Sequence, residues 1–401
     1  MPANYIADAP IWHLNLPSAK LAHMDPRLIV GTMSGTSADG VDAAITRITG
    51  RGTEMAAQLV SHHYHPYPND LRQEIFAFRN DQVKQDVLGR LARMSRGITL
   101  ATAAAVNDAL TKAKLQPSQI TAVAAHGQTL FHDPPITIQW FDPSLLAHET
   151  NCTVVSDFRR ADLAAGGQGA PLVPFADYIL FRHPTKNRVL LNLGGIANIT
   201  WLPAGCTTEQ VLAFDTGPAN CISDWICRTR GPLDMSWDVD GQGASRGRVV
   251  HEVVDHFLQD GYVAIIGPKS TDGPAMIAAF ERALASSKHA PTELNDLLAT
   301  AAYLTARTIV DSIHAVTKRV DEVIASGGGT HNKAIMNWLA SKLTPTPVKL
   351  TEDAGVSGPA KEALAFALLA AATLDNLPSN IPSVTGAARS LILGSITPQT
   401  P

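Results

Sequence analysis

Two similar hairpin patterns, one at the start of each half of the chain, constrain the fold more than any other feature. The first, LIVGTMSGTSADGVDAAITRI from Leu28, has an apolar strand, a turn rich in glycine, serine and threonine, and a second strand. The second, RVLLNLGGIANITWL from Arg188, has the same layout around Gly194 and Gly195. Apolar runs joined by residues that tolerate unusual backbone angles are typical of β-hairpins. Two such hairpins predict a duplicated domain plan.

Strand and helix patterns alternate around the hairpins. Helical periodicity covers residues 69–80, 85–113 and 291–320, a stretch from about 332, and residues 359–375, which are apolar on most sides and should be buried. Strand patterns cover residues 122–125, 136–139, 153–156, 210–213 and 322–325. Strands mixed with helices in each half predict an α/β protein.

Composition limits the function without defining it. The 401 residues allow roughly two to three domains, and a formal net charge of -4 with no basic run argues against nucleic acid as a partner. No apolar run approaches the ~18 residues of a membrane span. Residues 1–26 lack the plan of a signal peptide, so we interpret them as an N-terminal extension, or as sequence upstream of a start at Met24. Four scattered cysteines indicate reduced thiols in a cytoplasmic protein.

The common phosphate and nucleophile motifs are missing. The first turn lacks the lysine of a P-loop and the spacing of a serine-hydrolase elbow. The GxG at Gly167 continues to Leu172 where a dinucleotide fingerprint needs glycine. What remains is SGTSADG from Ser34, whose amides and hydroxyls suit an oxyanion, with Asp39 or Asp42 able to orient Mg²⁺ through water. A plain polar turn is the alternative.

Three further segments are candidates for a site. Gly327, Gly328 and Gly329 lie between a strand and a helix, where bare backbone admits a flat group such as adenine or simply makes a tight turn. Asp215, in FDTGP, is predicted to follow a strand, as a general base or as a helix N-cap. The stretch 157–171 pairs arginines with carboxylates, which suits recognition of a carboxylate or of sugar hydroxyls, or else an internal ion-paired loop.

Histidines add two smaller predictions. His126, followed by Gly127 and Gln128, ends a predicted strand, where a ligand-facing side chain and a structural histidine are equally reasonable. The cluster of His62, His63 and His65 is interpreted as a solvated strand without metal, because no acidic or cysteine partner stands at ligand spacing.

Eight segments together resemble the anhydro-N-acetylmuramic acid kinase family, over roughly residues 28–395. In chain order they are SGTSADGVD, AHGQT, DFRRADLAAGGQGAPLVP, NLGGIANIT, FDTGPAN, GPKST, GGGTHN and EALAFA. The family belongs to the superfamily of hexokinases, actin and heat-shock chaperone ATPases. Ala38, Ala219 and Asp272 depart from its usual residues, and Asp272 does so in the loop after GPKST.

The resemblance implies a two-lobed, actin-like or ribonuclease H-like fold with an active-site cleft between the lobes. We expect the first lobe to take residues 27–165 and 376–401, and the second to take residues 166–375. ATP would be held by the two hairpins, with Mg²⁺, and by the triple-glycine turn at the adenosine. The expected ATP-binding residues are Gly35, Thr36, Ser37, Ala38, Asp39, Gly40, Val41, Asp42, Gly194, Gly195, Gly327, Gly328 and Gly329.

The resemblance also implies a reaction. Asp215 would activate water, which opens the 1,6-anhydro ring of the sugar while the released O6 takes the γ-phosphoryl group of ATP. Gln128, Arg159 and Glu362 are the expected sugar contacts, and no residue is assigned to a resident metal. A homodimer is expected. Levoglucosan kinases share much of the pattern, so levoglucosan is the alternative substrate, and an actin-like ATPase without a sugar is a second alternative.

Overall fold

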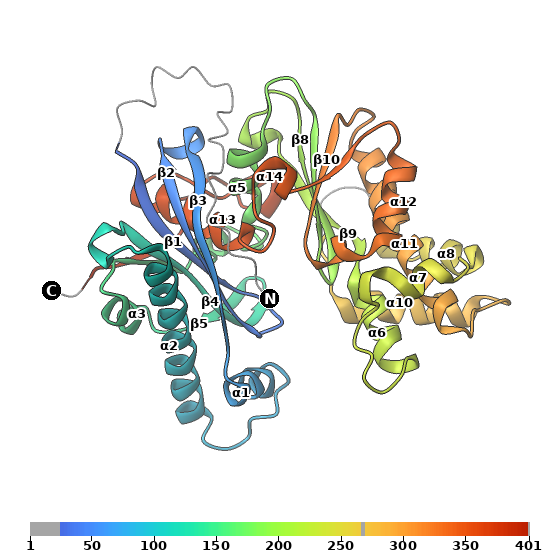
Figure 1. The fold of residues 1–401 in the computed structure, drawn as a ribbon, viewed down its shortest axis with the longest axis horizontal. Helices are drawn as coiled ribbons and strands as arrows, with labels where there is room; N and C mark the ends of the chain where they lie inside the picture. Colours follow the sequence, from blue (N-terminus) through green and yellow to red (C-terminus); the bar gives the residue numbers. More distant parts are fainter. Residues whose placement is uncertain (1–24, 266–268, 400–401) are drawn as a thin grey trace. The chain divides into compact units, whose positions relative to one another are not determined.

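The computed structural model describes residues 25–265 and 269–399, which form two compact α/β units (Figure 1). Unit 1 contains the described residues up to Leu180 and those from Gly355 onward, and unit 2 is the segment Phe181–Ala354. The predicted N-terminal extension lies almost entirely outside the described residues. Among the described residues, no helix is both long enough and apolar enough to cross a bilayer.

Unit 1 is built on a seven-stranded mixed sheet with the order β12-β6-β4-β1-β2-β3, and β5 pairs with β4. β1 is antiparallel to β2 and parallel to β4, so the first predicted hairpin is confirmed. The strands are β1 Arg27–Ser34, β2 Gly40–Thr49, β3 Ala56–Pro66, β4 Ala122–Asp133, β5 Ile136–Trp140, β6 Val154–Ser156 and β12 Ser395–Thr397. The helices are α1 Asn69–Arg79, α2 Val87–Ala113, α3 Pro143–Thr150, α4 Arg160–Ala164, α5 Val173–Phe181, α13 Lys361–Leu374 and α14 Pro382–Thr385.

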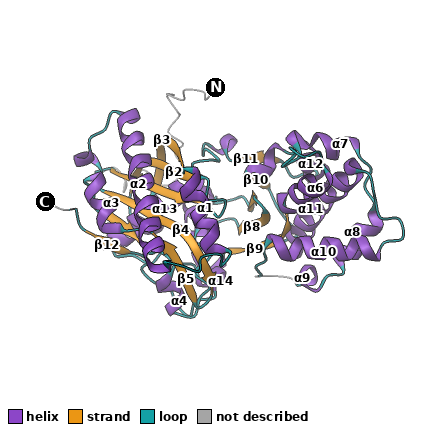
Figure 2. Ribbon diagram, turned by 90° about the horizontal axis from the view of Figure 1, so that it is seen from below, coloured by secondary structure: helices purple, strands orange, loops and turns teal. Residues whose placement is uncertain are grey.

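Helices cover both faces of this sheet (Figure 2). The apolar side of α2 packs against one face, which includes Val30, Val41 and Val123. The alanine-rich α13 packs against the other face so closely that a Cβ on Gly31 would lie 1.7 Å from the carbonyl oxygen of Ala363. Only a glycine in β1 permits this approach.

Unit 2 repeats the arrangement on a five-stranded sheet with the order β11-β10-β7-β8-β9. β7 is antiparallel to β8 and parallel to β10, as β1 is to β2 and β4, which confirms the duplicated plan. The strands are β7 Arg188–Leu193, β8 Ile196–Leu202, β9 Leu212–Pro218, β10 Glu322–Ser326 and β11 Val348–Leu350. The helices are α6 Asn220–Arg230, α7 Gln242–Arg246, α8 His251–Leu258, α9 Gly261–Ala264, α10 Gly273–Ser286, α11 Leu294–Val316 and α12 Lys333–Leu343.

The unit boundaries differ from the predicted lobes, which assigned residues 166–375 to the second lobe. The structure places residues 166–180 and 355–375 in unit 1. One reason is the packing of α13 on β1. A second is the buried ion pair between Lys361 Nζ and Asp177 Oδ1, 3.0 Å apart, which joins α13 to α5. A third is the hydrogen bond at 2.8 Å from the Gly169 N–H to Asp162, which fixes the glycine-rich loop.

Two strands are longer than the sequence predicted. β4 continues to Asp133, so His126 and Gln128 lie inside a strand and not at its end. β9 begins at Leu212 and runs to Pro218, so Asp215 also lies within a strand instead of following one. In both cases pairing with a neighbouring strand extends the element through glycine-containing sequence that has low intrinsic strand propensity.

Candidate active site

The predicted site residues fall into two groups, one in each unit. In unit 1 the turn between β1 and β2 is anchored by Ala38, which is fully buried and has a positive φ of 48°. Its N–H donates to the carbonyl oxygen of Gly35 at 3.1 Å. Where β2 begins, a Cβ on Gly40 would lie 2.4 Å from the carbonyl oxygen of His65. The backbone of the turn is therefore fixed from below.

The exposed tip of this turn is also ordered by side chains. Thr36, Ser37 and Asp39 are exposed, and the Ser37 hydroxyl donates to Asp39 Oδ1 at 2.7 Å. The Arg79 guanidinium on α1 donates to the carbonyl oxygen of Thr36. The tip thus presents hydroxyls, amides and one carboxylate to solvent, the set that suits a phosphate and its metal.

Gln128 supports the turn from inside the sheet. Its side chain is completely buried, accepts a hydrogen bond from the Ser34 hydroxyl at 2.7 Å and donates one to the carbonyl oxygen of Gly35 at 3.1 Å. The structure therefore brings this predicted sugar contact against the first hairpin.

Arg159 is held by uncharged acceptors. Its Nε and Nη2 lie 3.0 and 2.8 Å from Nε2 of His126, and its Nη1 donates to the carbonyl oxygen of Gly169 at 2.8 Å. Burial, followed by the charge of Arg159, lowers the pKa of His126 well below its ordinary value, which leaves a neutral imidazole that can accept these bonds. Burial also lowers the pKa of Arg159 to about 10. The arginine remains cationic at neutral pH and suits an anionic ligand group.

Glu362 lies in the first turn of α13, within reach of the same charges. Its side chain is exposed, yet the surrounding protein removes enough water to raise the pKa of its carboxyl group. The Asp42 carboxylate adds to this increase, whereas Lys361 and Arg159 oppose it. Asp42 itself is 2.7 Å from Nε2 of His62 on β3. Glu362 is therefore within electrostatic reach of both Arg159 and Asp42 in unit 1.

In unit 2 the second hairpin and the triple-glycine turn form one cluster. A Cβ on Gly329 would lie 2.8 Å from the Cβ of Leu193, so only a glycine fits beside β7. At the start of α6 the Asn220 N–H donates to the carbonyl oxygen of Gly194 at 3.0 Å. Gly195 and Gly328 differ, because a Cβ there would meet nothing within 4 Å. Bare backbone is open to a ligand at these two positions.

Asp215 is fixed by the segment that precedes α10. Its Oδ2 accepts from the Thr271 N–H at 3.0 Å and from the Ser270 hydroxyl at 3.1 Å, and its own N–H donates to the Lys269 carbonyl at 3.0 Å. Burial raises the pKa of this carboxyl group, although the Thr271 amide, the Ser270 hydroxyl and the Lys269 charge oppose the increase. The N-cap of α6 is Ala219, so the helix-cap interpretation of Asp215 is wrong.

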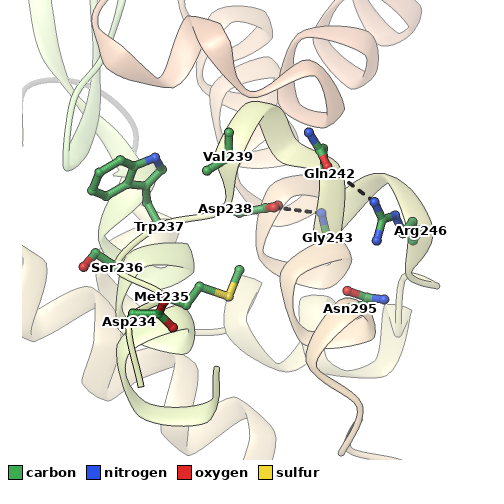
Figure 3. Close-up of a pocket in the computed structure, with 10 residues that line it drawn as sticks. All are labelled: Asp234, Met235, Ser236, Trp237, Asp238, Val239, Gln242, Gly243, Arg246 and Asn295. Atoms are coloured by element: carbon green, nitrogen blue, oxygen red, sulfur yellow. Dashed lines mark hydrogen bonds between the residues drawn. The ribbon is translucent and has the colours of Figure 1, made fainter. Parts of the chain in front are cut away.

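A cavity next to the triple-glycine turn was not predicted (Figure 3). It has a volume of 320 Å³ and lies between Trp237 and Val239 on one side and Arg246 and Asn295 on the other. A Cβ on Gly241, close to the cavity wall, would lie 2.2 Å from Oδ1 of Asn332, which caps α12 just after the turn. The available signal in the sequence was Trp237 inside an acidic and glycine-rich run. In the structure this tryptophan is 60% exposed.

Other partners were missed because they are distant in sequence. His126 was identified only as an ambiguous histidine, and its pairing with Arg159 spans 33 residues. The hydroxyl of Tyr262 on α9 donates to the carbonyl oxygen of Asp215 at 3.0 Å, across 47 residues. Neither pair has a local pattern that could have predicted it.

Comparison with known proteins gives a consistent result. Residues 27–399 match the family described as anhydro-N-acetylmuramic acid kinase. A protein of that name from Bacillus cereus (strain AH820) is 38% identical over 389 residues, covering 92% of this chain and 98% of the relative. A protein of that name from Bacillus anthracis has the same identity and coverage.

Solved structures match this chain with lower sequence identity than these relatives do. Component A of the (R)-2-hydroxyglutaryl-CoA dehydratase of Acidaminococcus fermentans has a TM-score of 0.42 at 12% identity, covering 85% of this chain and 96% of that one. A ROK family glucokinase from Streptomyces griseus, in complex with glucose and AMPPNP, has a TM-score of 0.37 at 12% identity, covering 85% and 97%. The sequence comparisons, which extend over nearly all of the described residues, show that the chain belongs to the anhydro-N-acetylmuramic acid kinase family.

Proposed function

We propose that this chain uses ATP and water to convert 1,6-anhydro-N-acetylmuramic acid into N-acetylmuramic acid 6-phosphate, a step in the recycling of cell-wall sugar. Membership of the family supports the class of enzyme and the sugar. The same membership leads us to propose a homodimer that acts in the cytoplasm, and light scattering from the purified chain would test the dimer.

The geometry of Asp215 is the observation on which the proposal rests. Both hydrogen bonds to its carboxylate come to Oδ2, and within the described residues none comes to Oδ1. A carboxylate that is fixed through one oxygen leaves the other available to accept a proton from water. Because burial raises its pKa, Asp215 is a stronger base than an ordinary aspartate.

The bond changes follow from this role. Asp215 Oδ1 takes a proton from water, and the water oxygen forms a bond to the anomeric carbon. The bond from that carbon to the bridging oxygen breaks, and the released O6 forms a bond to the γ-phosphorus of ATP. The bond between this phosphorus and the oxygen that bridges the β- and γ-phosphates breaks, so ADP leaves and the phosphoryl group stays on O6. Transfer to phosphorus removes the charge that would otherwise accumulate on a poor leaving group, so the two steps assist one another.

Backbone and hydroxyl groups are proposed to hold the nucleotide. The turn after β1 would bind phosphate oxygens through its exposed tip, and the open backbone at Gly195 and Gly328 would lie against ATP. Mg²⁺ keeps most of its waters and needs only one or two carboxylates, which the exposed Asp39 and the nearby Asp42 can supply. When bound, it would neutralise charge on the transferred phosphoryl group.

Arg159 supports the muramyl sugar over levoglucosan. The muramyl sugar has a lactyl carboxylate that levoglucosan lacks, and all the hydrogen bonds of Arg159 within the described residues go to uncharged acceptors. Among the described residues, no carboxylate is hydrogen-bonded to Arg159, so its guanidinium can bind a ligand carboxylate directly. Glu362 would accept hydrogen bonds from sugar hydroxyls. Gln128, which is buried under the turn, would contribute by shaping it.

Measuring ADP release with a panel of sugars tests this proposal. We expect fast release with anhydro-N-acetylmuramic acid, slow release with levoglucosan and almost none without sugar. ATP turnover that is unchanged by any sugar would reject the kinase in favour of a plain ATPase. Faster turnover of levoglucosan than of anhydro-N-acetylmuramic acid would support the kinase activity and would identify levoglucosan as the substrate.

A further inference from the structure

A cluster of two histidines and one aspartate lies at the edge of the unit 1 sheet, and the proposed function assigns no role to their side chains. His63 and His65 are two apart on β3, so their side chains share one face of the strand. That face packs on α2, which carries Asp108. Nε2 of His63 and Nδ1 of His65 lie 3.2 and 3.4 Å from Oδ2 of Asp108. The sequence-based expectation of no acidic partner is therefore wrong, because tertiary packing supplies one.

We propose that His63, His65 and Asp108 bind a transition-metal ion of the Zn²⁺ class. Zn²⁺ lies about 2.0–2.2 Å from imidazole nitrogen and carboxylate oxygen, so ligand atoms at the corners of a tetrahedron are roughly 3.3–3.5 Å apart. The two measured separations agree with this spacing, and all three donor atoms lie within 4.8 Å of one another. A water molecule would complete the tetrahedron.

The donor set also determines which ions fit. Two imidazole nitrogens and one carboxylate oxygen suit Zn²⁺, Co²⁺, Ni²⁺ and Cu²⁺, whereas Mg²⁺ requires oxygen ligands. The site is therefore distinct from any Mg²⁺ that accompanies ATP. The neighbouring His62 points to the opposite face of β3 and pairs with Asp42, so it takes no part.

Access and competition are both visible in the cluster. The side chains of His63, His65 and Asp108 are 16%, 31% and 51% exposed, so an ion can enter past the aspartate while α2 covers the deeper histidine. Nζ of Lys112 contacts Nδ1 of His63 and opposes a cation by its charge. The lysine is exposed on a flexible stem and can turn toward solvent, so it weakens the site without blocking it.

An ion here would hold an edge strand. β3 is the last strand of the sheet order, so within the described residues one of its sides has no strand partner. Coordination by residues of β3 and α2 would fasten that edge to the helix beneath it. Edge strands need such protection because their free backbone groups can pair with other chains.

Titration of the full-length protein with Zn²⁺ and Co²⁺ tests the site. We expect one saturable site, with the intense visible absorption of four-coordinate Co²⁺. His65→Gln and Asp108→Asn should each weaken it by more than ~100-fold, since even the loss of an outer-shell partner costs about 10- to 100-fold. Lys112→Gln should tighten it at least ~3-fold by removing a like charge. The matched control, His148→Gln, removes an exposed imidazole of α3 and should change nothing.

Hydrogen exchange provides a second readout. Zn²⁺ should slow exchange of the β3 amides in the parent protein and have no such effect in Asp108→Asn. Zn²⁺ binding that survives both ligand substitutions, or that is indifferent to Lys112→Gln, would place the ion elsewhere and overturn the proposal. Zn²⁺ binding that leaves the exchange of the β3 amides unchanged would contradict the proposal that the ion fastens β3 to α2.

Discussion

Asp215 depends for its orientation on residues that are far from it in sequence. Its two donors, Ser270 and Thr271, are 55 and 56 residues away, and both bind the same carboxylate oxygen. At the scale of single residues, this arrangement separates the fixed oxygen from the one proposed to act as a base.

Asp215→Asn should lower kcat by at least ~100-fold, the usual cost of losing a general base, while the affinity for ATP remains nearly unchanged. The amide oxygen can still accept the two hydrogen bonds, so the local structure is retained. Steady-state kinetics and nucleotide titration would measure the two effects. A matched control is Asp224→Asn, because Asp224 is a half-buried aspartate of α6 whose pKa is raised by burial to about 6. Near-normal turnover in Asp215→Asn would remove this residue from the mechanism.

Ser270→Ala should shift the acidic limb of the kcat–pH profile to higher pH. The hydroxyl of Ser270 stabilises the charged form of Asp215, so its removal raises the pKa of Asp215 further. A base is active only when deprotonated, so the variant should lose activity at a higher pH than the parent as the pH falls. The expected shift is up to about 1 unit, the equivalent of one modest hydrogen bond. An unchanged limb, or a shift to lower pH, would contradict this role.

Sequence reasoning can single out residues whose signal is local. The glycines of the turns and the aspartate of FDTGP are recognisable from their neighbours alone. Gln128 shows the limit of this reasoning, because a polar residue in a motif suggests a ligand contact, whereas packing has buried it as a support of the turn. Distant donors such as Thr271 leave no mark in the sequence around their acceptor.

At the scale of elements, the triple-glycine turn separates packing from binding. A Cβ on Gly329 would press on Leu193 at 2.8 Å, whereas a Cβ on Gly328 would meet nothing within 4 Å. Gly328→Ala should therefore keep the melting temperature of the parent and weaken ATP binding at least ~5-fold, the effect of about 1 kcal/mol of steric conflict with the ligand. Gly329→Ala serves as the comparison and should destabilise the fold. Unchanged ATP affinity in Gly328→Ala would show that the nucleotide lies elsewhere.

Most elements were predictable because their apolar periodicity is strong, as in α2 and α11. The predicted strand at residues 210–213 ended too early, because the segment from Asp215 to Pro218 has low intrinsic strand propensity. Pairing with β8 nevertheless extends β9 to Pro218. The composition of α13 predicted that the helix is buried, but it did not predict which of the two units the helix belongs to. The apolar sequence of a helix predicts that the helix is buried, but it does not indicate against which sheet the helix packs.

At the scale of the whole molecule, unit 2 is one continuous segment inserted into unit 1. Its core is formed entirely by its own residues, between Val189 and Leu343. Its entry is tied within the unit, because the Asn187 N–H donates to Asp321 at 2.7 Å and Arg188 donates to the carbonyl oxygen of Phe181 at 2.8 Å. These features indicate an independent folding unit.

A fragment of residues 181–354 should therefore fold without unit 1. We expect a cooperative thermal transition by circular dichroism and dispersed amide resonances by NMR. A fragment of residues 25–180 is the control, because it lacks α13 and should leave one face of its sheet uncovered. A fragment 181–354 without a cooperative transition would show that its stability depends on the rest of the chain.

The packing of α13 against β1 also affects how the protein is made. These two elements come from opposite ends of the described chain, and β1 leaves the ribosome long before α13 has been translated. At about 5–20 residues per second, the interval is tens of seconds. During that time one face of the nascent sheet has no helix to cover it, while unit 2 can already complete its fold. We therefore expect chaperones to bind the nascent N-terminal half. A stop codon just before α13 would leave this face of the sheet permanently uncovered.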